Sequence, residues 1–90
     1  MPTDKPQRSA AALTEQVGEE TLITSRGGEA IHVLNGTAGA IWQLCDGRHT
    51  AVEMAAEVAT RFAAPVGVDV LGDVQRILAA LQVKGLLEPA

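Results

Sequence analysis

The sequence predicts an α+β fold in which a three-stranded antiparallel sheet is followed by three helices. Two observations lead to this prediction. Residues 12–34 contain three short stretches rich in β-forming residues, and glycines separate them. After Leu34 the spacing of apolar residues changes from a period of 2 to a period of 3.6, which is typical of amphipathic helices. With 90 residues, the chain has room for one thin core built from aliphatic side chains, since Trp42 and Phe62 are its two aromatic residues.

The three predicted strands span residues 12–17, 20–25 and 29–34. Gly18 fits the first connection and Gly27–Gly28 fits the second. Tight hairpins need a positive φ at their central residues, and glycine adopts it without steric penalty. We therefore expect a meander in which the third strand lies at an edge of the sheet.

The first two helices are predicted from their caps as well as from their spacing. Asn35 is a suitable N-cap for the first helix, and Asp46–Gly47 ends it. Thr50 and Glu53 match a capping box at the start of the second helix. The expected apolar faces are Ala38, Ile41, Trp42 and Cys45 in the first helix, and Val52, Ala55, Ala56, Ala59 and Phe62 in the second.

The third helix follows a break at residues 65–68. Asp69 is its predicted N-cap, Gly85 ends it, and Leu86–Leu87 can add a short extended contact. Its expected apolar face consists of Val70, Val74, Ile77, Leu78 and Leu81. The second and third helices also have the lengths of a helix-turn-helix pair.

Composition limits the class of protein. The net charge is −4 at pH 7 and no basic cluster occurs, which argues against a nucleic-acid ligand. One cysteine excludes an internal disulfide and zinc modules that need several thiolates. No apolar run approaches the ~20 residues of a membrane span, and the start has no secretory signal. We expect a cytoplasmic protein with a flexible N-terminal arm (1–9) and a single domain (10–90).

We identify no group of residues in the sequence that is arranged for catalysis. Residues 45–49 bring together a thiol, a carboxylate and an imidazole, but Cys45 belongs to an apolar helical stripe, and buried thiols are common in cores. We interpret the segment as a core cysteine followed by a turn. The acidic residues Glu15, Glu19, Glu20 and Glu29 are expected on solvated surface. The sequence thus predicts no enzyme activity, no cofactor and no metal site.

The third predicted strand indicates a binding function. It is hydrophobic and has neither the Pro nor the Lys that commonly protects a sheet edge. Such an edge can accept an extended peptide as an added strand, with the third helix as the opposite wall. The alternative is that the protein covers this edge itself. The candidate peptide-binding residues are Ala30, Ile31, His32, Val33 and Leu34 on the strand, and Asp73, Arg76, Ile77, Ala80 and Lys84 on the helix.

Three segments resemble the PqqD family of pyrroloquinoline quinone biosynthesis proteins and related peptide-recognition elements. They are residues 34–50 (LNGTAGAIWQLCDGRHT), Asp69–Val70 and the closing Gly85–Leu87. The resemblance covers roughly residues 12–88. It implies a winged-helix-like fold and a non-catalytic peptide chaperone. Such a chaperone binds the leader of a ribosomally made precursor beside the third strand and presents the precursor to a modifying enzyme, typically a radical S-adenosylmethionine enzyme.

Two other functions remain open at this point. A winged-helix DNA-binding protein is the main alternative, although its recognition helix would span 69–84 with no net charge. A homodimer formed by pairing two open edges is compatible with peptide binding.

Overall fold

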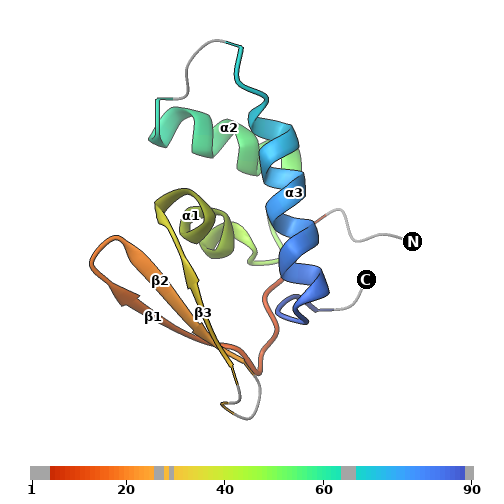
Figure 1. The fold of residues 1–90 in the computed structure, drawn as a ribbon. Helices are drawn as coiled ribbons and strands as arrows, with labels where there is room; N and C mark the ends of the chain where they lie inside the picture. Colours follow the sequence, from red (N-terminus) through yellow and green to blue (C-terminus); the bar gives the residue numbers. More distant parts are fainter. Residues whose placement is uncertain (1–4, 26–27, 29, 64–66, 89–90) are drawn as a thin grey trace.

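The computed structural model describes residues 5–25, 28, 30–63 and 67–88. It confirms the predicted fold class: a three-stranded antiparallel sheet is followed by three helices, of which α1 lies against the sheet while α2 and α3 pack on α1 and on each other (Figure 1). In chain order the elements are β1 (Leu13–Val17), β2 (Glu20–Thr24), β3 (Ile31–Leu34), α1 (Gly36–Leu44), α2 (Ala51–Arg61) and α3 (Val70–Val83).

The sheet has the order β1-β2-β3, so β2 is central. Ile23 lies opposite His32, and Thr21 lies opposite Leu34. Alternation of side chains places these four residues on the face that the helices cover, where Ile23 is fully buried. The other face is exposed and partly apolar. Its exposed large hydrophobic residues are Leu13, Val17, Ile31 and Val33.

The three predicted N-caps are confirmed. Asn35 Oδ1 accepts a hydrogen bond from the Ala38 amide at 2.9 Å. Thr50 and Glu53 form a reciprocal capping box, with distances of 3.1 Å and 2.8 Å. Asp69 caps α3 by accepting from the amide of Gly72. These local signals fix where each helix begins, because the first amides of a helix lack partners within it.

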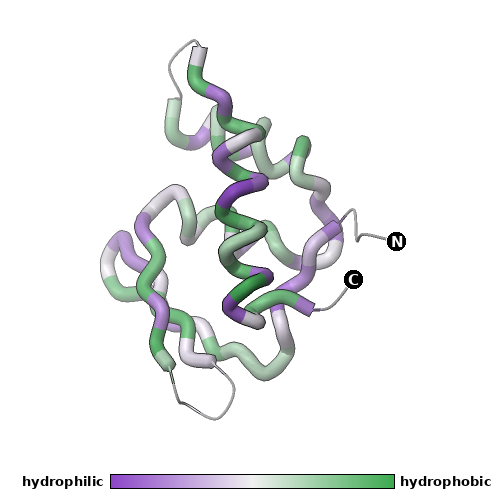
Figure 2. The backbone as a smooth tube through the Cα atoms, turned by 45° about the vertical axis from the view of Figure 1, so that its right-hand side comes forward, coloured by the Kyte–Doolittle hydropathy of each residue, from purple (hydrophilic) through white to green (hydrophobic). Residues whose placement is uncertain are grey.

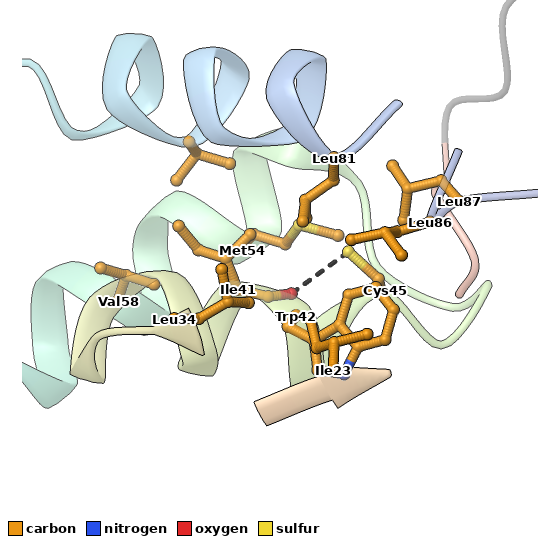
Figure 3. Packing of buried hydrophobic residues seen from close by; sticks show 11 residues of the cluster. Ile23, Leu34, Ile41, Trp42, Cys45, Met54, Val58, Leu81, Leu86 and Leu87 are labelled. Atoms are coloured by element: carbon orange, nitrogen blue, oxygen red, sulfur yellow. Dashed lines mark hydrogen bonds between the residues drawn. The ribbon is translucent and has the colours of Figure 1, made fainter. Parts of the chain in front are cut away.

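One hydrophobic core joins the helices to the sheet (Figure 3). The expected faces of α1 and α3 are confirmed, since Ile41, Trp42, Val74 and Leu81 are buried. The indole Nε1 of Trp42 donates to Thr14 Oγ1 at 2.9 Å, which satisfies its polar atom. The predicted contact at Leu86–Leu87 is also present, because both side chains are buried in the same core.

The predicted apolar face of the second helix is largely wrong, although Ala55 does pack against the core. Val52 is 65% exposed and Phe62 is 43% exposed, whereas Met54 and Val58 are the buried residues of α2. Apolar residues are spread around most of this helix, so spacing alone did not select a face. Met54 and Val58 stand four residues apart and therefore point to the same side of α2, which faces the core.

Glycine at position 39 permits close contact between α1 and β2. A Cβ atom there would lie 2.6 Å from Thr21 Oγ1, closer than such atoms approach one another. Thr21 is itself fixed, since its hydroxyl donates to Gln16 Oε1 at 2.9 Å and its side chain is buried. The position thus requires glycine because α1 lies directly on β2.

The sequence predicts a flexible N-terminal arm over residues 1–9. Residues 1–4 of this arm lie outside the described residues. From Pro6 to Ser9 it contacts the rest of the chain. Arg8 bridges to Leu87, and its Nη1 donates to the carbonyls of Trp42 and Gln43 at 3.0 Å and 2.8 Å. A cation at these carbonyls also complements the negative end of the α1 dipole. Within the described ranges, no helix is long and apolar enough to cross a membrane.

Candidate functional site

The third strand forms an edge of the described sheet. It pairs with β2 on one side, and in Figure 1 its other side is the side on which α3 is drawn. Ile31 is 65% exposed and Val33 is 56% exposed, while His32 is half-buried. Ala30 precedes the strand, and its carbonyl oxygen accepts a hydrogen bond from the Ser25 amide at 2.9 Å.

The register shows which backbone groups of β3 face away from β2. In an antiparallel pair, directly opposite residues alternate between exchanging hydrogen bonds and exchanging none. Because the Ser25 amide donates to Ala30, the Ile23–His32 pair exchanges hydrogen bonds and its neighbours along the strand do not. The amides and carbonyls of Ile31 and Val33 therefore point away from β2, toward the edge.

The first hairpin leads to the same assignment. Val17 and Glu20 close a two-residue connection, and the closing pair of such a hairpin exchanges hydrogen bonds. Every second residue of β2 from Glu20 onward therefore bonds to β1, which leaves Thr21 and Ile23 to bond to β3. Two independent turns thus agree that positions 31 and 33 present their peptide groups at the edge.

Of the five predicted helical residues, four lie in α3 and Lys84 is its C-cap residue. Ile77 is half-buried against the core, whereas Ala80 and Lys84 are exposed. Arg76 pairs with Asp73 three residues before it. Hydrophilic and hydrophobic residues alternate along the turns of this helix (Figure 2). Leu34 at the end of β3 and Leu81 of α3 belong to one core, so the two elements are anchored together.

The electrostatics of α3 do not suit DNA. Val70–Val83 contains one acidic and one basic residue, and these two form the Asp73–Arg76 ion pair. A helix that binds in the major groove needs cations available for phosphates. Neither the fold nor the charge of this helix adds support to the DNA-binding alternative.

The thiol, carboxylate and imidazole at 45–49 do not converge. Cys45 Sγ donates to the carbonyl of Ile41 at 3.2 Å within the core (Figure 3), and burial raises its pKa to about 12. His49 Nδ1 instead lies 2.9 Å from Asp46 Oδ1, and this contact, together with the Arg48 amide, lowers the pKa of Asp46. The thiol stays protonated at neutral pH, and the His49 imidazole contacts Asp46 rather than the thiol, as expected for a core cysteine followed by a turn.

A pocket of about 210 Å³ lies between the three helices, at a place that the sequence did not suggest. Its floor is formed by the buried side chains of Ile41, Val58 and Val74, and Phe62 and Val68 lie at its mouth. No sequence signal indicates this pocket, because its lining comes from three helices and from Val68 before α3. Among the described residues, no group of three or more potential metal ligands occurs.

Comparison with known proteins identifies the family. A family model described as "Coenzyme PQQ synthesis protein D (PqqD)" matches residues 20–87. The chain belongs to the PqqD family. This membership confirms the resemblance that residues 34–50 and 85–87 indicated, and the matched region contains β2, β3 and all three helices. A search of curated proteins finds no significant match.

The PqqD-family fold also occurs in a solved structure, "TbiB1 in Complex with the TbiA(beta) Leader Peptide". The similarity has a TM-score of 0.77 at 22% sequence identity, and it covers 93% of this chain and 96% of the other. The two chains therefore share their architecture over nearly their whole lengths.

Proposed function

We propose that this PqqD-family protein binds the leader segment of a ribosomally made precursor peptide as a fourth strand beside β3. The observation that carries the proposal is the row of outward-facing peptide groups at Ile31 and Val33. Strand addition uses such groups for affinity and uses neighbouring side-chain contacts for specificity. The solved structure of similar fold, whose chain is in complex with a leader peptide, supports a leader peptide as the ligand.

The exposed surfaces on either side of the added strand suit an extended peptide. Its side chains would alternate between the outer face, beside Ile31 and Val33, and the helical face, beside Ile77 and Ala80 of α3. Ala80 is small, which leaves room for a side chain of the peptide. His32 and Lys84 supply polar groups at the margins.

The role of the complex is to present the peptide to a modifying enzyme, of the radical S-adenosylmethionine type, in the biosynthesis of pyrroloquinoline quinone or of a related modified peptide. Holding the leader on an enzyme-bound adaptor turns the encounter of the core peptide with the active site into a nearly intramolecular event, at an effective concentration on the order of millimolar. The protein itself supplies binding and position, and the enzyme supplies the chemistry.

The direct test is a titration of the protein with the leader of the precursor peptide encoded beside its gene, followed by calorimetry and by NMR. We expect heat of binding and shifts at residues 30–34 and 73–84, with a scrambled leader as control. Amide exchange sharpens the test. Exchange at Ile31 and Val33 is expected to slow on binding, whereas His32, already bonded to β2, changes little. No heat and no protection at 31 and 33 would refute strand addition.

A further inference from the structure

The pocket between the helices lies at the common end of β3 and α3. Leu34 ends β3, and Thr37, in the first turn of α1, contributes to the pocket wall. From the other side the wall is formed by Val70, Asp73 and Val74, in the first half of α3. Asp73 therefore belongs both to the proposed peptide-binding stripe and to this pocket. Because Thr37 follows Leu34 by three residues, the pocket lies within reach of a strand that pairs with β3 and continues past Leu34.

The size and lining of the pocket define its occupant. A dry apolar cavity of about 150 Å³ is enough to bind benzene, so about 210 Å³ accommodates one phenyl ring or one branched aliphatic side chain. Ile41 and Val74 are fully buried at its floor, so the bottom of the pocket offers aliphatic surface. Asp73 also lines the pocket, and because its carboxylate pairs with Arg76, it adds no unpaired charge that would select for or against a charged occupant.

We infer that this pocket binds one large apolar side chain of the leader, at a fixed position a few residues beyond the segment that pairs with β3. This inference rests on the proposed function and adds a specificity site to it. Burial of one such side chain distinguishes a cognate leader from other extended peptides. Strand addition alone cannot do so, because its backbone hydrogen bonds form with peptides of many sequences.

The test is a selection of random peptides of about 15 residues by mRNA display against the 90-residue protein. The variant Val68→Phe fills the mouth of the pocket, at a residue that is 46% exposed and can be replaced without disturbing the core. Val52→Phe, at a residue 65% exposed on α2 and outside the pocket, is the matched control. Far-ultraviolet circular dichroism of each variant verifies the fold.

We expect the wild-type protein and Val52→Phe to select peptides with an invariant large apolar residue beside an alternating segment. For Val68→Phe, this preference is expected to disappear, and peptides selected on the wild type should bind at least tenfold more weakly. An unchanged motif and affinity with Val68→Phe would overturn the pocket assignment while leaving strand addition intact. Failure of the wild type to select any peptide would overturn both the pocket assignment and strand addition. The two negative results can therefore be told apart.

Discussion

Replacing Val33 with proline tests the assignment of free backbone groups at the edge of β3. The Val33 amide points away from β2, so proline removes a donor to the bound peptide without removing a hydrogen bond of the sheet. A peptide carbonyl left without a partner costs about 1–3 kcal/mol, which corresponds to a loss of about 5- to 150-fold in affinity. Because Val33 is 56% exposed, the free energy of unfolding should change by less than about 1 kcal/mol.

Two variants provide the controls. His32→Pro removes an amide that bonds to β2 opposite the fully buried Ile23, so it is expected to lower the free energy of unfolding by about 1–3 kcal/mol. Val33→Ala keeps the amide and should retain most of the affinity. Calorimetry measures binding, and urea unfolding is followed by the fluorescence of Trp42 in a chain that has no tyrosine. If Val33→Pro binds as tightly as Val33→Ala, or unfolds as readily as His32→Pro, the register argument is refuted.

Three further predictions concern the fold. Gly39→Ala should destabilise the protein by about 1–3 kcal/mol in urea, because its Cβ meets Thr21 Oγ1, and adding Thr21→Ala should restore much of the loss. Thr50→Ala should cost about 1 kcal/mol through the lost capping box, and Thr50→Ser should not. As pH rises above 9.0, the unfolded Cys45 thiol ionises while the folded one, with a pKa of about 12, does not. Stability should therefore fall by up to about 1.4 kcal/mol per pH unit, and Cys45→Ala should remove this component.

Each of these predictions has a contrary result. Equal unfolding midpoints for the wild type and Gly39→Ala would show that α1 can move away from the sheet without loss. Equal stability of the alanine and serine variants at position 50 would assign the capping box no net role. Parallel stability curves from pH 9 to pH 11 for the wild type and Cys45→Ala would place the thiol in contact with water.

The local signals in this sequence determined much of the fold. Caps at Asn35, Thr50 and Asp69 were readable because their partners lie within three residues. The strands followed from β-forming residues between turns. Gly18 has a positive φ in the first turn as expected, and Gly28 does so in the second, whereas Gly27 lies outside the described residues. The family followed from residues 34–50, a segment in which the motif is continuous along the chain.

The tertiary structure decided what depends on the relation between elements. The face of α2 that is buried could not be chosen from spacing, because apolar residues surround it and only packing selects Met54 and Val58. The need for glycine at position 39 arises from a β2 side chain eighteen positions earlier in the sequence. The pocket at Phe62 requires three helices to meet, and no single segment encodes it.

The candidate site illustrates the same division. Hydrophobicity and the absence of Pro or Lys from 29–34 were enough to indicate an open edge. Which amides that edge presents depends on the register of β3 against β2, and a shift by one residue would exchange Val33 for His32. The sequence by itself thus predicted that the third strand lies at an edge of the sheet, and the strand order confirms this position. Only the pairing of strands, a property of contacts between distant segments, decided that Ile31 and Val33 are the residues whose peptide groups point away from β2.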